Sequence, residues 1–104
     1  MDINEIKNRM DEFVRSKGWY EPNSQKPQSG KNLSISLAIE ASELLECFQW
    51  NDPADARGVE DELADVVLYA AQIANIMRID LETVIERKLA SNHERKWMTA
   101  GVEE

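Results

Sequence analysis

The sequence predicts an all-α fold of four helices arranged like a bundle. Only three prolines and four glycines interrupt 104 residues, and apolar residues recur at helical spacing in four segments. The composition, 42% hydrophobic and 31% charged without a low-complexity tract, is that of one globular domain. We therefore expect a single domain over residues 1–104, with 98–104 as a disordered tail. Its modest core would be completed by oligomerisation.

The first helix is expected at residues 2–16, with Asp2 as its N-cap and Gly18 ending it. The apolar positions that recur there are Ile3, Ile6, Met10, Phe13 and Val14. Residues 17–30 (KGWYEPNSQKPQSG) follow as a loop, because they contain two prolines, two glycines and many polar residues.

The second helix is expected at about residues 32–50. Its apolar stripe consists of Leu37, Ala41, Leu44, Leu45 and Phe48. At about 100° per residue, Glu40 and Glu43 lie together along one edge of that stripe, about 60° apart. Glu46 falls toward the opposite side, where we expect it to be solvated.

The third helix is expected at residues 53–77, and Gly58 could interrupt it. Asp52 is a suitable N-cap and Pro53 suits the first helical position. The apolar stripe consists of Leu63, Val66, Val67, Ala70, Ala71, Ala74 and Met77.

A second acidic edge accompanies this third stripe. Glu62, Asp65 and Tyr69 cluster on it within about 60° of arc. The edge lies on the same rotational side of its stripe as Glu40 and Glu43 do on theirs. Two helices packed through their stripes could therefore bring both acidic pairs to a common site.

The fourth helix is expected at about residues 81–97, capped by Asp80. Its inward positions are Leu81, Val84, Ile85 and Leu89. Its last turns hold the basic cluster of the chain, which consists of Lys88, Asn92, His93, Arg95, Lys96 and Trp97.

The net charge of −8 disfavours a nucleic-acid polymer as partner, since such binding draws on lysine and arginine. A phosphorylated ligand would need a divalent cation or the local basic cluster. The single Cys47 excludes an intramolecular disulfide framework. No apolar run approaches 18 residues and no signal peptide is evident, so we expect a soluble cytoplasmic protein without a membrane partner.

Two pairs of carboxylates at i, i+3 spacing point to a magnesium site. Mg²⁺ takes oxygen ligands and keeps several waters, so Glu40, Glu43, Glu62 and Asp65 could hold one or two ions. Without the cation, these groups would repel each other and some would take up protons. The alternative is that they belong to solvated helix faces, because the chain has 20 acidic residues.

Other sites are excluded or less favoured. A di-iron bundle needs a Glu-x-x-His motif on two helices. This chain has one histidine, His93, and the residue three positions before it is Ala90 instead of a glutamate, so a di-iron site is excluded. P-loop and Rossmann glycines do not occur. Cys47 fits a buried small residue better than a nucleophile. In the polar loop, Trp19 and Tyr20 either pack on the core or contact a ligand.

The segments IEASELLECFQW and EDELADVVLYAAQIA resemble the MazG-like nucleotide pyrophosphohydrolases, in the all-α NTP pyrophosphatase group. The similarity rests on Glu40-x-x-Glu43 and Glu62-x-x-Asp65, with Tyr69 four residues on. It covers about residues 2–97. The flanking matches are Gly18-Trp19, Lys31-Asn32-Leu33, Lys88, Asn92 and Arg95-Lys96-Trp97.

This resemblance implies hydrolysis of a nucleoside triphosphate, often a deoxynucleotide, to the monophosphate and pyrophosphate. It assigns Mg²⁺, with Mn²⁺ as a substitute, to the four acidic positions, one of which could also orient the attacking water. The implied substrate-binding residues are Trp19, Lys31, Trp50, Tyr69, Lys88, Asn92, Arg95 and Lys96. Among them, Trp19 and Trp50 match base-pocket positions, and Tyr69 matches a position near the phosphates or sugar.

The resemblance also implies a homodimer or a homotetramer built as a dimer of dimers, with sites formed by more than one subunit. One departure concerns the C-terminal basic stretch, which often ends in Tyr-Pro but here reads Lys96-Trp97-Met98. That departure affects the role of Trp97 and leaves the metal site untouched.

Two other functions stay open from the sequence. The chain could be a non-catalytic helical interaction module whose acidic edges keep it in solution. It could also be a pyrophosphatase for a nucleoside diphosphate or a phosphoribosyl nucleotide. Base preference, number of ions and physiological role are not set by the pattern.

Overall fold

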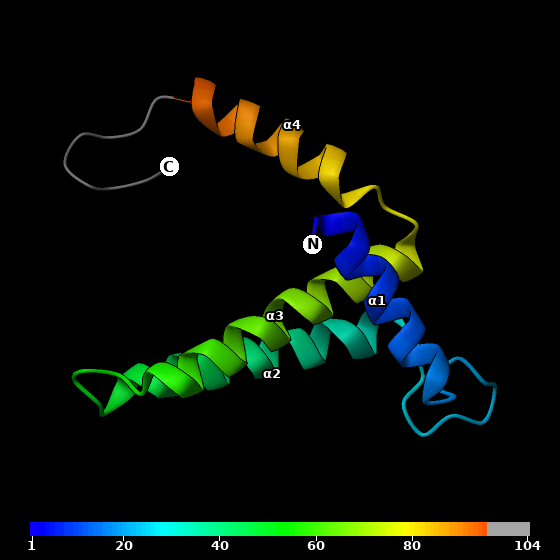
Figure 1. The fold of residues 1–104 in the computed structure, drawn as a ribbon, viewed down its shortest axis with the longest axis horizontal. Coiled ribbons are helices and arrows are strands. Elements are labelled where there is room, and N and C mark those ends of the chain that lie inside the picture. Colours follow the sequence, from blue (N-terminus) through cyan, green and yellow to red (C-terminus); the bar gives the residue numbers. More distant parts are fainter. Residues whose placement is uncertain (96–104) are drawn as a thin grey trace.

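The computed structural model describes residues 1–95, and within them the secondary structure is entirely helical (Figure 1). The helices are α1 (Ile3–Ser16), α2 (Gly30–Gln49), α3 (Ala56–Met77) and α4 (Leu81–Glu94). The prediction of an all-α chain with four helices is confirmed.

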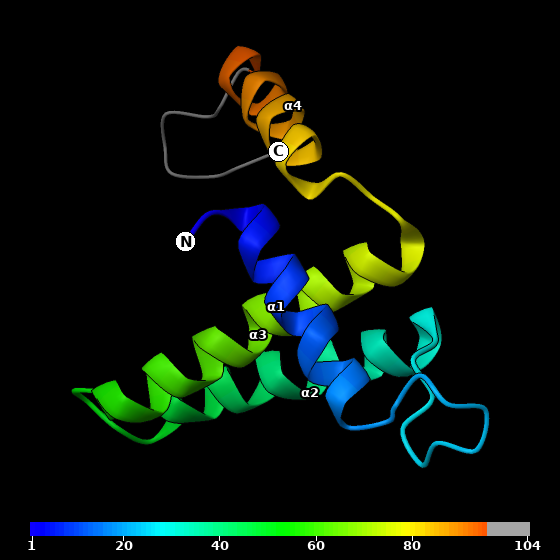
Figure 2. The same cartoon turned by 45° about the vertical axis from the view of Figure 1, so that its right-hand side comes forward.

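The long helices α2 and α3 run antiparallel as a hairpin, and α1 crosses α3 (Figures 1 and 2). The last helix, α4, extends away from the hairpin and packs mainly on α1. The radius of gyration is 16.5 Å, whereas a compact chain of this length would have about 13 Å. The bundle is therefore open on the side of α4.

Side-chain caps define where the helices begin. Asp2 accepts a hydrogen bond from the Glu5 amide at 2.9 Å, and Asp80 accepts one from the Thr83 amide at 3.3 Å, both as predicted. Helix α2 begins at Gly30, two residues earlier than expected, because the Ser29 hydroxyl accepts from the Asn32 amide.

The prediction that Asp52 caps α3 is wrong. The N-cap is Asp55, whose carboxylate accepts from the Arg57 amide at 3.2 Å, so Pro53 lies outside the helix. An N-cap residue itself has an extended backbone, and here that residue is Asp55, three positions after Asp52.

The interruption that Gly58 could have caused does not occur, and α3 continues through it. A methyl group at this position would lie 3.2 Å from the Cys47 sulfur of α2. The glycine therefore lets the two arms of the hairpin approach closely, without breaking the helix.

The end of α4 is also earlier than predicted. The helix ends at Glu94, with Arg95 as its C-cap, instead of reaching residue 97. Lys96, Trp97 and the tail expected to be disordered at 98–104 lie outside the described residues.

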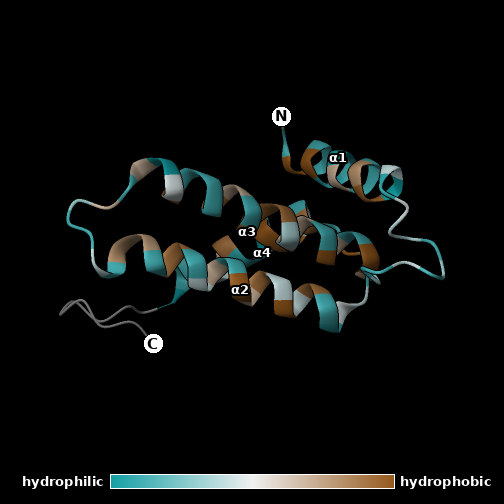
Figure 3. Ribbon diagram, turned by 90° about the horizontal axis from the view of Figure 1, so that it is seen from below, coloured by the Kyte–Doolittle hydropathy of each residue, from teal (hydrophilic) through white to brown (hydrophobic). Residues whose placement is uncertain are grey.

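The core lies where α1 and α2 pack against the second half of α3, and apolar residues line these facing surfaces (Figure 3). Its buried apolar residues are Met10, Val14, Leu33, Ala71 and Ala74. Much of the predicted stripes stays exposed, including Leu45 at 67%, Phe48 at 54% and Leu89 at 63%. A search of the described helices finds none long and apolar enough to cross a membrane.

Candidate metal centre and adjoining cavity

Three of the four predicted carboxylates come together between the arms of the hairpin. Glu40 of α2 and Glu62 and Asp65 of α3 each place an oxygen within 4.8 Å of the other two. On α3 the i, i+3 spacing puts both side chains on one face, and the antiparallel packing of α2 sets Glu40 opposite them. The convergence of the two acidic edges therefore occurs within one chain.

Two of these carboxylates carry an oxygen without a partner. The Oε2 atoms of Glu40 and Glu62 are buried and have no hydrogen bond. A buried ionised carboxylate is unfavourable unless a proton, a donor or a cation compensates its charge. The site therefore has an unmet requirement for positive charge.

The protonation equilibria reflect the same crowding. The pKa of Glu40 is raised to about 7, first by its hydrogen bond with Glu62 and then by burial and by Glu43. The pKa of Glu62 is also raised. Its hydrogen bond with Glu40 lowers that pKa, but burial and the negative charges of Glu43 and Asp65 outweigh this effect.

Glu43, the fourth predicted ligand, lies at the margin of the cluster. Its side chain is exposed, yet its charge contributes to the raised pKa of both Glu40 and Glu62. Glu46 is exposed as expected and does not join the three clustered carboxylates.

The clustered groups fit a hard divalent cation. All three ligand atoms are carboxylate oxygens, the donors that Mg²⁺ and Mn²⁺ prefer, and no sulfur or imidazole accompanies them. The unpartnered Oε2 atoms of Glu40 and Glu62 are the observation of this structure that supports the fit.

Next to the carboxylates lies a cavity of about 830 Å³ between α1, α2, α3 and the loop 17–29. Pockets of about 300–1,000 Å³ accommodate small-molecule ligands. Asp65 and Tyr69 form its α3 wall. Because Asp65 belongs to both the cluster and the cavity, a molecule held in the cavity would reach the carboxylates.

Trp19 contributes to the loop wall of this cavity and also packs on α1. Its ring meets Phe13 edge-to-face with centroids 5.6 Å apart, and Lys26 Nζ lies 4.8 Å from the Trp19 centroid. Packing on the core and contact with a ligand are therefore both possible for Trp19, since one edge of its ring packs on Phe13 and the residue also borders the cavity.

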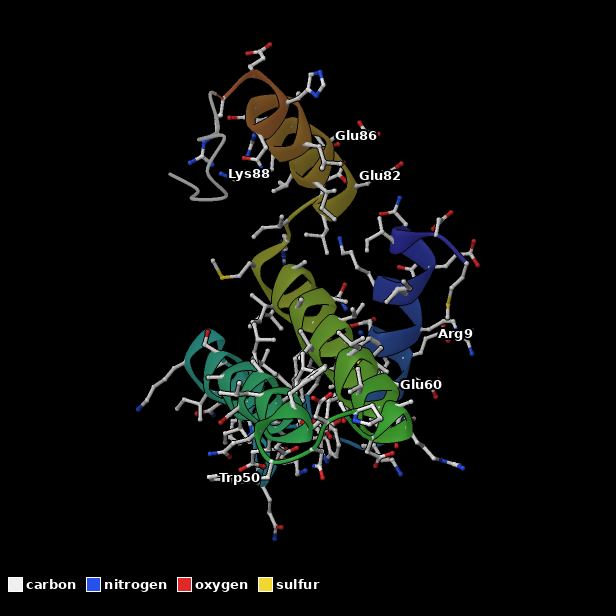
Figure 4. All side chains as sticks on the ribbon, turned by 90° about the vertical axis from the view of Figure 1, so that its left-hand side faces the viewer. Arg9, Trp50, Glu60, Glu82, Glu86 and Lys88 are labelled. Carbon is white, nitrogen blue, oxygen red and sulfur yellow. The ribbon has the colours of Figure 1, made fainter. Side chains whose placement is uncertain are left out.

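Two further predicted binding residues lie away from the cavity within one chain. Trp50 is the C-cap of α2 and is 86% exposed, at the end of the hairpin (Figure 4). Lys31 is exposed on the first turn of α2 and does not line the cavity.

The basic cluster on α4 is likewise separated from the carboxylates. Lys88 is exposed on α4 above the hairpin, as Figure 4 shows. Arg95, the C-cap of α4, donates from Nη1 to the side-chain oxygen Oδ1 of Asn92 at 3.2 Å. Within the described residues these three therefore belong to α4 and its C-cap, and Lys96 lies outside them.

The sequence reasoning missed the residues that shape the cavity from the loop and from the interior of α3. Lys26 and Gln28 line the cavity from a segment without periodicity. Gln72, fully buried, is hydrogen-bonded to Gln28. A glutamine inside the otherwise apolar run AAQIA was the one signal that could have pointed to it.

Comparisons with known proteins bear on the family and the fold. A model of the MazG-like family matches residues 35–103. A solved pyrophosphatase from Archaeoglobus fulgidus superimposes with a TM-score of 0.68 at 31% identity, covering 86% of each chain.

Among curated proteins, the chain is similar to proteins named dCTP pyrophosphatase 1. The human protein is 26% identical and the bovine protein 25%, each over 89% of this chain. The chain spans 58% of the length of these relatives. The family match over two thirds of the sequence and the shared fold lead to one conclusion: this chain belongs to the MazG-like family.

Proposed function

We propose that the chain catalyses Mg²⁺-dependent hydrolysis of nucleoside triphosphates, deoxynucleotides included, to the monophosphate and pyrophosphate. One observation carries this proposal: half-buried carboxylates, two of them with a buried and unpartnered oxygen, adjoin a cavity of a size for a nucleotide. The pyrophosphatases among its relatives support the reaction class.

The proposed metal ligands are Glu40, Glu62 and Asp65, joined by Glu43 from the margin of the cluster. A bound Mg²⁺, or Mn²⁺ in its place, would polarise a phosphoryl oxygen and neutralise the leaving pyrophosphate. One of the carboxylates would hold the attacking water in line with the α-phosphorus and accept a proton from that water.

The nucleotide would lie in the cavity with its phosphates toward Asp65. Trp19 offers a ring for the base, and stacking of this kind gains about 1–3 kcal/mol largely regardless of base identity. Tyr69, on the same wall as Asp65, would contact the phosphates or the sugar.

A second copy of the chain would complete the site. Trp50 lies at the end of the hairpin and Lys88 lies on α4, away from the carboxylates (Figure 4). Helix α4 extends away from the hairpin, and Asn92 and Arg95 lie at its end. We therefore place these groups in the site of a neighbouring subunit, in a homodimer or homotetramer. Exposed apolar side chains such as Leu45 and Phe48 would be buried in such subunit contacts.

A panel of nucleotides tests the reaction. The protein is incubated with each dNTP and NTP, with nucleoside diphosphates and with a phosphoribosyl nucleotide, and pyrophosphate and orthophosphate are measured separately. Because the curated relatives are named for dCTP, that nucleotide comes first. We expect monophosphate plus pyrophosphate with Mg²⁺, and none with EDTA. Since the substrates are soluble nucleotides, the proposed location is the cytoplasm.

The control for the mechanism compares one clustered carboxylate with one exposed carboxylate. Asp65→Asn removes a clustered carboxylate and should abolish turnover, whereas Glu46→Gln changes an exposed residue outside the cluster and should not. Turnover that survives EDTA, or release of orthophosphate instead of pyrophosphate, contradicts the proposal. Product from a diphosphate or phosphoribosyl nucleotide alone would reassign the substrate.

A further inference from the structure

A fully buried glutamine lies one helical turn beyond the cavity wall. Gln72 of α3 has 0% exposure and is the largest fully buried side chain in the described part of the chain. It follows Tyr69, which lines the cavity, by three residues. A buried amide is tolerated only when its hydrogen bonds are made, so its partners show what it holds.

Both ends of the loop 17–29 meet at this amide. Gln72 Nε2 donates to the Tyr20 hydroxyl at 3.0 Å and to the Gln28 side-chain oxygen at 3.0 Å. On the other side, the Gln72 oxygen accepts from Asn75 Nδ2 at 3.1 Å. Both N–H groups of one side chain are therefore used to join the start and the end of the loop to α3.

Tyr20 continues the connection to α1. Its hydroxyl donates to Asp11 at 2.5 Å, and the Arg15 guanidinium lies over its ring at 5.0 Å from the centroid. Arg15 also forms an ion pair with Asp11 at 3.2 Å. The tyrosine is thus fixed between two helices, and Gln72 supplies the link to α3.

The loop that is held in this way forms one wall of the cavity. Trp19, Lys26 and Gln28 line it from the loop, facing Tyr69 and Asp65 of α3. Among the other hydrogen bonds of residues 21–28, one joins the loop to α2, from Asn32 Nδ2 to the Pro27 carbonyl at 3.0 Å. Others are local, such as the Lys26 amide to the Ser24 hydroxyl at 2.9 Å. The position of the wall relative to α3 therefore depends on the Gln72 amide.

We propose that Gln72 is a positioning residue. Its two side-chain hydrogen bonds, to Tyr20 and to Gln28, fix the position of the loop wall and thereby determine the affinity for the nucleotide. This inference rests on the proposed function of the same cavity. Gln72 touches no reacting group. Loss of the Gln72 amide should weaken the contacts between the loop wall and the nucleotide, which are equally strong in the ground state and in the transition state.

The main test is Gln72→Leu, which keeps the volume and removes the hydrogen bonds. We expect KM for the best nucleotide to rise about tenfold while kcat stays within about twofold, the signature of lost uniform binding. Hydrogen–deuterium exchange of peptides covering 17–29 should become faster. The matched control is Lys7→Met, which removes a 2.6 Å bond from Lys7 Nζ to the Ile79 carbonyl away from the loop.

Tyr20→Phe provides a second variant if Gln72→Leu does not fold. It removes one of the two bonds and keeps the ring, so a smaller rise in KM, about threefold, is expected. An unchanged KM in both variants overturns the inference, and so does an equal rise in Lys7→Met. Absence of turnover in the wild type overturns the proposed function instead, and loop exchange then still reports whether Gln72 holds the loop.

Discussion

At the scale of single residues, Glu40 shows the opposing effects of a clustered carboxylate on stability and on metal binding. It lies within 4.8 Å of two other carboxylates, and its Oε2 has no partner. Without a cation, its charge destabilises the fold. With a cation bound, the same carboxylate would serve as one of its ligands.

We therefore expect Glu40→Gln to have opposite effects on stability and on activity. Metal-free protein should melt at a higher temperature than wild type, because one of the mutually repelling carboxylates is gone. The rise in melting temperature that Mg²⁺ causes in wild type by mass action should be largely lost. Hydrolysis should fall at least about 100-fold.

Thermal melts with and without Mg²⁺ check this prediction, with Glu46→Gln as the control on the same helix. Its side chain is exposed and lies outside the three clustered carboxylates. A Glu40→Gln protein that still gains the full Mg²⁺ shift would remove Glu40 from the ligand set.

Tyr20 gives a second residue-scale prediction, which concerns pH. The pKa of Asp11 is lowered, first by the hydrogen bond from Tyr20 and also by Arg15. A lowered folded-state pKa stabilises the protein above the ordinary value of 3.8, and this stability is lost as the pH falls through the folded-state pKa. Tyr20→Phe should therefore cost about 1–2 kcal/mol at pH 7 and less near pH 3.

Urea unfolding of wild type and Tyr20→Phe at both pH values measures that difference. An equal loss at pH 7 and pH 3 would mean that the hydroxyl acts through Gln72 alone. Phe13→Leu is a useful comparison, because it alters packing beside the same loop and leaves both Asp11 and Tyr20 in place.

The residues that sequence reasoning found and missed differ in a physical way. Glu40, Glu62 and Asp65 could be placed because each lies at a fixed angle from an apolar stripe on its own helix. Gln72 and Gln28 could not be paired, since they are 44 positions apart and one lies in a loop without periodicity. Local spacing predicts a face of a helix, but it does not predict which loop returns to it.

At the scale of elements, the end of α3 carries a conformational strain. Arg78 is its C-cap in the left-handed region, with φ 55° and ψ 45°, a conformation that favours glycine. Its side chain is exposed, so its replacement leaves the core intact.

Arg78→Gly should stabilise the protein by about 0.5–1 kcal/mol, because relief of the strain exceeds the added freedom of the unfolded chain. For a domain of this size that is a rise of about 2–8 °C in melting temperature. Arg78→Ala serves as the control, since it removes the same side chain and keeps the strain. Equal melting temperatures for the alanine and glycine variants would contradict the argument.

Helix boundaries show why element ends were harder to predict than helices. Asp52-Pro53 and Asp55 are both acceptable starts for α3, and spacing does not decide between them. Gly58 looked like an interruption because glycine weakens helices, yet the nearby Cys47 sulfur explains it as a point of close packing. That contact belongs to the hairpin and is invisible from either helix alone.

At the scale of the whole molecule, the open arrangement predicts association. The radius of gyration of 16.5 Å and the 63% exposure of Leu89 on α4 show apolar surface that the rest of residues 1–95 does not cover. The prediction that Ile85 and Leu89 of α4 face inward is wrong for the described chain, where they are 39% and 63% exposed. Spacing alone, however, is the same whether a helix packs on its own chain or on another.

We expect sedimentation velocity to show a dimer or tetramer, and Leu89→Glu to weaken it about ten- to hundredfold in dissociation constant. The matched control is Ser91→Glu, which adds the same charge at an exposed polar position of the same helix. If activity requires the second copy, Leu89→Glu should become active again at high protein concentration. A wild-type monomer at all concentrations would contradict association.

The paired bonds of Gln72 also have an evolutionary consequence. Because Tyr20 and Gln28 are both tied to one side chain, residues 21–27 form a lobe whose ends are fixed independently of its contents. Substitutions or length changes inside the lobe can reshape one wall of the cavity while the helices and carboxylates stay in place. The lobe is thus a replaceable module, and exchanging it is a route by which one helical scaffold could acquire a preference for a different ligand.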